Sequence, residues 1–247
     1  MTEQPVKSAP HKLRKTPDRL PKSVPERALA LARMWNDSRR AARHDDSIFI
    51  HIPKNGGTSV YTMLHSAGLV KLNSLRAVQL FFRGKGRVTF GHMAVGSLVE
   101  LGMVPQDYVD RAFKFALSRD PYARAASLYR IYCKMTATWH RQASFHDFLK
   151  MLADGYYNRI GPYDSLGMSP CNPQVAWLRD TPPDKIYRVE DLREFADDIS
   201  ERWKIAKPDL VHMNWTSRST ELNLSPDEKA LIKEVYRDDF ETLGYDK

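Results

Sequence analysis

The stretch SIFIHIPKNGGTS, from Ser47 to Ser59, decides the fold of this chain. Its first six residues are mostly apolar, β-branched or aromatic, which predicts a short buried strand that Pro53 ends. Two successive glycines are unfavourable in helices and strands alike, so residues 54–57 form a loop. Thr58 or Ser59 is then expected to cap a helix that continues to about residue 66. The stretch therefore predicts a strand, a glycine loop and a helix in direct succession.

The glycine loop 54–57 has the features of an anion site. Glycines let backbone N–H groups approach an anion closely, and the start of a helix adds unpaired donors and partial positive charge. Lys54 supplies a full charge, and Thr58 and Ser59 supply hydroxyls. Each hydrogen bond to a charged group contributes about 1.5–3 kcal/mol, so several together can hold a phosphate-like group. The alternative is a plain glycine turn that only begins a helix.

The order of Lys54 and the glycines differs from the Walker A loop. That pattern has four residues between its glycines and a lysine after the second glycine. Here the lysine precedes both Gly56 and Gly57. A loop of another class is therefore indicated.

Further strands and helices alternate along the chain. Strands are predicted at 87–90, 112–117 and 185–189, and helices at 26–43, 121–135, 145–153, 192–203 and 227–240. Such alternation predicts an α/β protein with three layers, in which helices cover both faces of a central parallel sheet. Ligands of these sheets bind beyond the carboxyl ends of the strands.

A second candidate for anion binding, SRDPYARAAS (residues 118–127), follows the strand predicted at 112–117. Arg119 lies at the strand end and Ser127 about two turns into the next helix, so both can reach one phosphate beside the first loop. The planar fork of arginine binds phosphate oxygens in pairs. Asp120 is expected to orient Arg119 or to cap the helix, and Arg124 to be a solvated helix residue. The alternative for Arg119 is a surface ion pair.

Together, residues 50–59 and 118–127 resemble the two segments with which sulfotransferases hold the donor PAPS (3′-phosphoadenosine 5′-phosphosulfate). The first is similar to the family's 5′-phosphosulfate loop, most of all to that of carbohydrate sulfotransferases such as the heparan sulfate 2-O and 6-O types. The second is similar to the 3′-phosphate motif, in which an arginine and a serine eight residues later clasp the phosphate. The likeness covers about residues 47–245 and implies the family's fold, which is like that of P-loop nucleoside triphosphate hydrolases.

The resemblance implies an enzyme that transfers a sulfuryl group from PAPS to an acceptor hydroxyl by in-line displacement and releases PAP. The acceptor is expected to be a carbohydrate or another small metabolite, and no metal is required. Lys54 would neutralise charge on the leaving phosphate, which makes it a catalytic residue as well as a donor ligand. The expected donor-binding residues are Lys54, Asn55, Gly56, Gly57, Thr58, Ser59, Arg119, Ser127 and Arg218.

A histidine is expected to act as the general base, because its pKa suits proton transfer near neutral pH. His92 is the first choice, since it directly follows Gly91 at the end of the strand predicted at 87–90. The alternative for His92 is a hydrogen bond to the backbone alone. His51 is expected to be packed, and His140 and His146 are further candidates.

Two other functions stay open. A P-loop kinase with an unusual loop would turn over ATP with Mg²⁺, although neither a lysine after the glycines nor a clear aspartate for Mg²⁺ is found. A non-catalytic nucleotide-binding scaffold would bind PAP and transfer nothing.

Charge and composition define the remaining organisation. Residues 1–25 hold five prolines and are expected to be a disordered basic tail, residues 26–45 an N-terminal helix, and residues 46–247 the sulfotransferase domain. Residues 1–45 carry eleven Lys/Arg and five Asp/Glu, a net +6 of the total +8, so the domain is nearly neutral, unlike a nucleic-acid binder. No apolar run has the length of a membrane span and no export signal is evident, so a cytoplasmic protein is expected.

Overall fold

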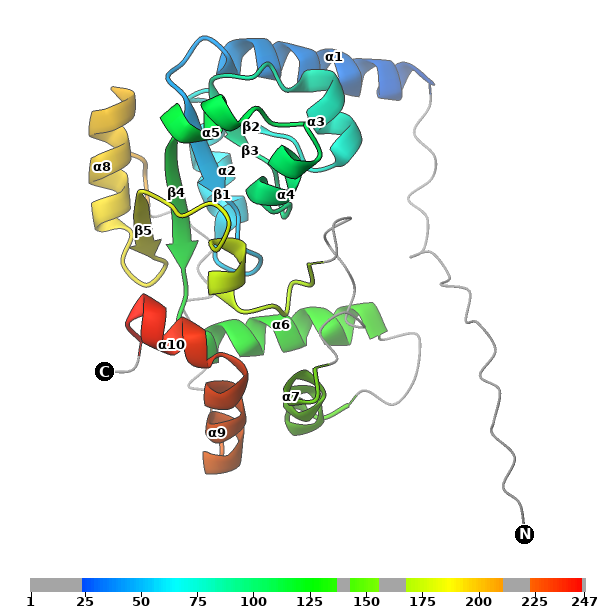
Figure 1. The fold of residues 1–247 in the computed structure, drawn as a ribbon, viewed down its shortest axis with the longest axis vertical. Coiled ribbons are helices and arrows are strands. Elements are labelled where there is room, and N and C mark those ends of the chain that lie inside the picture. The colour runs from blue at the N-terminus through cyan, green and yellow to red at the C-terminus, as the bar shows by residue number, and fades with distance from the viewer. Residues whose placement is uncertain (1–23, 137–142, 156–167, 211–222, 246–247) are drawn as a thin grey trace.

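The structure is a computed structural model that describes residues 24–136, 143–155, 168–210 and 223–245. The strands are β1 (Ser47–Ile50), β2 (Val70–Lys71), β3 (Arg87–Thr89), β4 (Phe113–Ser118) and β5 (Lys185–Arg188). The helices are α1 (Val24–Ala41), α2 (Gly57–His65), α3 (Leu75–Phe81), α4 (Val95–Glu100), α5 (Gln106–Arg111), α6 (Pro121–Thr136), α7 (Phe145–Ala153), the 3₁₀ helix η2 (Gln174–Trp177), α8 (Arg193–Trp203), α9 (Pro226–Val235) and α10 (Arg237–Leu243). Figure 1 shows their arrangement.

The strands form one parallel sheet in the order β2-β3-β1-β4-β5. After the central strand β1, the chain forms β2 and β3 on one side of it and then β4 and β5 on the other side. The strand order therefore reverses at β1, and the crevice that such a reversal leaves lies at the carboxyl ends of β1 and its neighbours.

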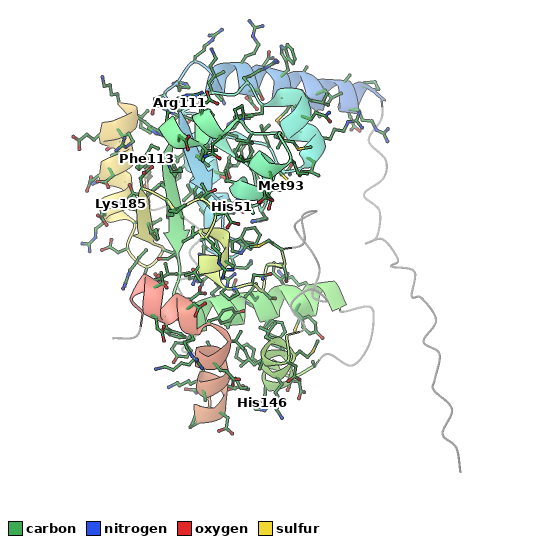
Figure 2. The ribbon with its side chains drawn as sticks, viewed as in Figure 1. His51, Met93, Arg111, Phe113, His146 and Lys185 are labelled. Carbon is green, nitrogen blue, oxygen red and sulfur yellow. The ribbon has the colours of Figure 1, made fainter. Side chains whose placement is uncertain are left out.

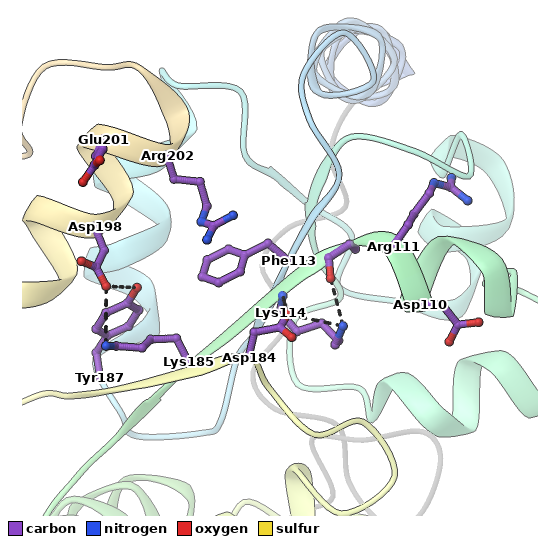
Figure 3. A pocket seen from close by; sticks show the side chains of 11 residues that line it. Asp110, Arg111, Phe113, Lys114, Asp184, Lys185, Tyr187, Asp198, Glu201 and Arg202 are labelled. Carbon is purple, nitrogen blue, oxygen red and sulfur yellow. Dashed lines mark hydrogen bonds and ion pairs between the residues drawn. The ribbon is translucent and has the colours of Figure 1, made fainter.

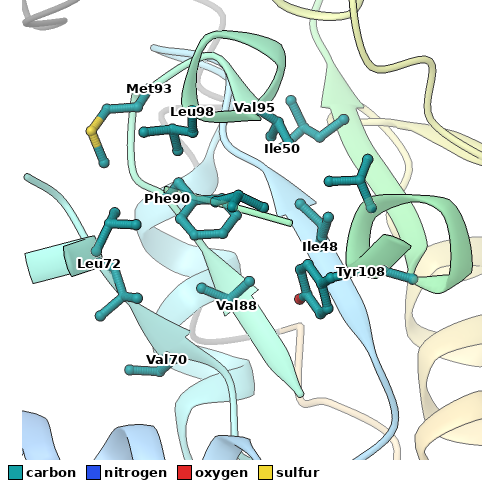
Figure 4. Packing of buried hydrophobic residues seen from close by; sticks show 14 of the residues in the cluster. Ile48, Ile50, Val70, Leu72, Val88, Phe90, Met93, Val95, Leu98 and Tyr108 are labelled. Atoms are coloured by element: carbon teal, nitrogen blue, oxygen red, sulfur yellow. The ribbon is translucent and has the colours of Figure 1, made fainter. Parts of the chain in front are cut away.

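Alternating side chains of β1 build two separate apolar layers. Ile48 and Ile50 face a cluster with Val78 of α3, Leu98 of α4 and Tyr108 of α5, part of which Figure 4 shows. Since successive residues of a strand point to opposite faces, Phe49 turns to the other face. There it packs with residues of α2 and α8, including Val60, Leu64, Phe195 and Ile199. The predicted three-layer α/β/α fold is thus confirmed.

A third apolar cluster stands apart from the sheet. It joins α6, α7, α9 and α10 through residues that include Leu128, Phe148, Ile232 and Phe240. In Figure 1 these helices lie beyond the arrowheads of β1 and β4. They therefore close the molecule on the side to which the carboxyl ends of the strands point.

Two features of the predicted elements need correction. The helix expected over 227–240 is two helices, because the chain bends at Tyr236, whose buried hydroxyl donates to the Cys171 carbonyl at 3.1 Å. The short elements β2, α3, α4 and α5 were not predicted. Over the described residues, no helix combines the length and apolar composition needed to cross a bilayer.

Candidate anion-binding site

The loop between β1 and α2 contains two residues in the left-handed conformation. Lys54 has φ 70° and Gly56 has φ 74°. Glycine adopts this conformation freely, whereas it costs a lysine about 1–2 kcal/mol. Gly56 is the N-cap of α2 and has no side-chain cap, so the prediction that Thr58 or Ser59 caps the helix is wrong. The helix begins earlier because Gly56 already turns the chain.

The early start of α2 determines which amides it offers to an anion. The N–H groups of Ser59 and Val60 both donate to the Gly56 carbonyl, at 3.0 and 3.3 Å. The amides of Gly57 and Thr58 stand at the head of the helix, where an α-helix has no internal acceptor for them. This end also carries the positive pole of the helix dipole.

Gly57 is required by a close approach of His51. A Cβ atom at position 57 would lie 2.0 Å from Cδ2 and Nε2 of the His51 ring. This ring is buried and stacks on Phe49, with 5.4 Å between ring centroids. The expectation that His51 is packed is confirmed.

His92 lies beside His51 at the end of β3, and their ring centroids are 4.2 Å apart. Nδ1 of His92 lies 3.0 Å from the His51 carbonyl oxygen, which can only accept. Nδ1 therefore carries the proton of the neutral ring and Nε2 carries the lone pair. Burial lowers the pKa of His92, the charges of Lys71 and Lys54 act in the same direction, and the bond to His51 opposes them. Together these effects favour a neutral imidazole.

Arg119 connects the second segment to the loop. It follows β4 directly, and its Nη1 donates to the Lys54 carbonyl at 3.1 Å. Burial lowers the pKa of the Lys54 ammonium, and the positive charges of Arg119, Arg130 and Lys134 lower it further. Several cations therefore crowd this edge of the sheet, which an anion would stabilise.

The helix α6 follows Arg119 and contains Ser127, which is buried. The Oδ1 atom of Asp120 accepts from the Ala123 amide at 2.8 Å, so Asp120 caps the start of this helix. The expectation that Arg124 is solvated is wrong, since its side chain is only 1% exposed. It donates to the carbonyls of Pro53, Pro170 and Asn172. Arg124, which lies on α6, therefore connects this helix by hydrogen bonds to the loop after β1 and to the segment before η2.

The side chain of Asn55 points into the protein. Its Nδ2 donates to the Leu117 carbonyl at 2.7 Å and to Oε1 of Gln174 at 2.6 Å. The Asn55 side-chain amide therefore anchors the loop, and the expectation that Asn55 belongs to the donor-binding residues stays a prediction. Gln174 was not predicted to take part.

Arg218 and His140 lie outside the described residues. His146 lies on α7, well away from His51 in Figure 2. In the described ranges, no group of three or more His, Cys, Asp or Glu side chains is arranged to hold a metal ion.

A hollow of about 880 Å³ lies at the opposite edge of the sheet, at the starts of β4 and β5 (Figure 3). Its charged side chains form ion pairs, such as Lys114 with Asp184 and Lys185 with Asp198. This balance of charge contrasts with the excess of cations around Lys54.

No protein-family model matches the chain, and no curated protein matches it. Among solved structures, it is similar to a sulfotransferase from Alicyclobacillus acidocaldarius, with 15% identity and a TM-score of 0.48. The match covers 81% of this chain and 94% of that one.

Proposed function

We propose that the chain is a PAPS-dependent sulfotransferase, with residues 46–247 as its catalytic domain. It would transfer a sulfuryl group to a hydroxyl of a carbohydrate or another small metabolite. The observation that carries the proposal is the junction of the two anion-binding segments, where the Arg119 guanidinium meets the Lys54 carbonyl at 3.1 Å. Two cationic segments in contact suit a donor that carries a phosphosulfate at one end and a 3′-phosphate at the other.

The donor would span the two segments. Lys54 and the amides of Gly57 and Thr58 would hold the 5′-phosphosulfate, and Arg119 with Ser127 would hold the 3′-phosphate. The backbone N–H of Ser59 already donates to the Gly56 carbonyl, so Ser59 would bind the phosphosulfate through its hydroxyl. The backbone of Asn55 and Gly56 would shape the loop. Arg218 stays a candidate ligand on the sequence pattern alone.

The reaction would be an in-line displacement at sulfur. The bond between sulfur and the oxygen it shares with the 5′-phosphate breaks while the bond from the acceptor oxygen to sulfur forms. The acceptor proton passes to Nε2 of His92, and the leaving phosphate of PAP keeps the electron pair. Lys54 and the head of α2 balance this negative charge, which is the main form of catalysis expected for such transfers.

The experiment that tests the proposal is a calorimetric titration with PAP, with ADP and ATP as controls. We expect micromolar or tighter binding of PAP and clearly weaker binding of ADP, because ADP lacks the 3′-phosphate. Equal binding of PAP and ADP would reject the proposed donor. Mg²⁺-dependent turnover of ATP would favour the kinase alternative.

Replacing Arg119 by alanine should weaken PAP binding about tenfold to hundredfold. The reason is the loss of charged hydrogen bonds worth about 1.5–3 kcal/mol to the 3′-phosphate. Isothermal titration measures this directly. Arg39→Ala is the matched control, because Arg39 is an exposed residue in the last turn of α1. An Arg119→Ala variant with wild-type affinity for PAP would contradict this assignment.

The pH dependence of kcat/KM for PAPS should have an acid limb below pH 6.5. A general base works only when deprotonated, so activity falls as the pH drops through the pKa of His92. Burial lowers that pKa from its ordinary value of 6.5. The limb in the free enzyme should therefore lie on the acid side of 6.5. A limb clearly above pH 6.5 would assign the titration to another group.

A further inference from the structure

Gln174 lies where the two phosphate-binding segments meet. It is the first residue of η2 and is fully buried. Its Oε1 accepts from Nδ2 of Asn55 at 2.6 Å and from the Arg119 amide at 2.9 Å. Its Nε2 donates back to the Arg119 carbonyl at 2.9 Å. One side-chain amide thus binds both the loop after β1 and the backbone after β4.

The two bonds to Arg119 resemble those of a neighbouring strand. The Arg119 N–H and C=O are both paired with the same amide group, directly after the last residue of β4. Residue 119 is therefore held at its backbone as well as through its guanidinium. The third bond, from Asn55, joins this backbone to the loop, beside the direct bond from Asn55 to the Leu117 carbonyl of β4.

Asp239 of α10 determines which way the Gln174 amide faces. Its carboxylate accepts from the main-chain amides of Gln174 and Val175, at 2.9 and 3.0 Å. The same carboxylate accepts from Nε2 of Gln174 at 3.2 Å. Because a carboxylate attracts the NH₂ end, Oε1 must face Asn55 and the Arg119 amide. Asp239 is itself buried, with Arg124 at 4.0 Å as the facing cation.

We propose that Gln174 is a positioning residue that sets the separation between the two phosphate-binding segments, and that Asp239 holds it in place from behind. This inference rests on the proposed function, because it concerns the two phosphates of the donor. A ligand held at two points gains affinity only if both points engage at once. In catalysis, a misplacement of about 1 Å can lower the reaction rate about a hundredfold, which shows how closely such groups must be placed.

The test compares PAP with 5′-AMP and 3′-AMP, each of which has one of the two phosphates. Calorimetry gives the dissociation constants for the wild type and for Gln174→Met, which keeps the length of the side chain and removes its hydrogen bonds. We expect PAP affinity to fall about tenfold to hundredfold, with less than about a threefold change for either monophosphate. Gln106→Met, on the exposed side of α5, is the matched control and should leave all three unchanged.

A second variant guards against a folding defect. Asp239→Asn keeps the shape of the side chain but presents an NH₂ group to donors, so the Gln174 amide loses its fixed direction. We expect the same selective loss for PAP, smaller in size. Thermal unfolding of each variant reports any general loss of stability, which would reduce binding of all three ligands together.

Each outcome separates the inference from the proposed function. The role of Gln174 is supported if both variants bind PAP more weakly but bind 5′-AMP and 3′-AMP as the wild type does. Unchanged PAP affinity in Gln174→Met, or an equal loss for all three ligands, overturns that role and leaves the donor site standing. A wild-type protein that binds PAP no better than 5′-AMP overturns the proposed function, and the inference with it.

Discussion

We expect the replacement of Lys54 by alanine to lower kcat/KM for the proposed sulfuryl transfer by about a hundredfold to a thousandfold. Lys54 is the only full charge in the loop 53–59, and this loop would contact the oxygen that leaves sulfur. Loss of one group that stabilises developing charge in a site of this kind costs about a hundredfold to a thousandfold. Burial and neighbouring cations lower the pKa of Lys54, which indicates a partly desolvated ammonium whose charge acts strongly on an anion.

Two further variants separate charge from backbone conformation at this position. Lys54→Gly removes the charge, and glycine adopts the left-handed φ of 70° without strain. This variant should therefore be as inactive as Lys54→Ala and at least as stable against unfolding as Lys54→Ala. Lys85→Ala changes an exposed lysine elsewhere and should have full activity. Rates are measured with labelled PAPS. Retention of more than about a tenth of the wild-type kcat/KM in Lys54→Gly would refute the catalytic role.

If His92 is the proposed general base, its replacement by alanine should lower kcat by about a hundredfold to ten-thousandfold, the usual contribution of such a base. PAP affinity should stay within about threefold, because His92 is assigned to the acceptor and not to the donor. Single-turnover kinetics measure the transfer step, and calorimetry measures the binding of PAP. This separation of rate from affinity is opposite to that expected for Arg119→Ala.

His92→Asn tests whether the ring acts by chemistry or by its bond to His51. An asparagine amide can donate to the His51 carbonyl as Nδ1 does, but it supplies no basic nitrogen. The variant should therefore be about as slow as His92→Ala. Recovery of most of the wild-type kcat in His92→Asn would reduce His92 to a structural hydrogen bond and move the base role elsewhere.

The elements of the fold that could be predicted are those whose residues form a recognisable pattern within a short stretch of the sequence. The strand, glycine loop and helix of residues 47–65 follow from apolar residues, two glycines and a short helical pattern read in one window. The two-residue strand β2 has no such pattern, because its pairing with Val88 and Thr89 of β3 defines it. At the bend, Tyr236 makes a hydrogen bond to Cys171, which is 65 residues away and cannot be inferred from the local sequence.

The same distinction holds for the candidate site. Lys54, His92 and Arg119 follow strand ends, so their place at one edge could be expected from a parallel sheet. Arg124 was misjudged because its acceptors, such as the Pro53 and Pro170 carbonyls, come from distant parts of the chain. Gln174 lies in a stretch that was expected to be largely irregular, where Asn172, Pro173 and Gln174 give only a weak resemblance to the family, and its contacts with Asn55 and Arg119 follow from the fold alone.

The burial of Arg124 also has a consequence for motion. Its guanidinium, on α6, donates to carbonyls of two other segments, to Pro53 in one and to Pro170 and Asn172 in the other, so we expect these two segments and α6 to move together. Opening that admits a large acceptor would therefore have to occur outside this unit. In hydrogen–deuterium exchange, amides of the buried middle of α6 should open only with global unfolding, and those of the short helix α4 at much lower free energy.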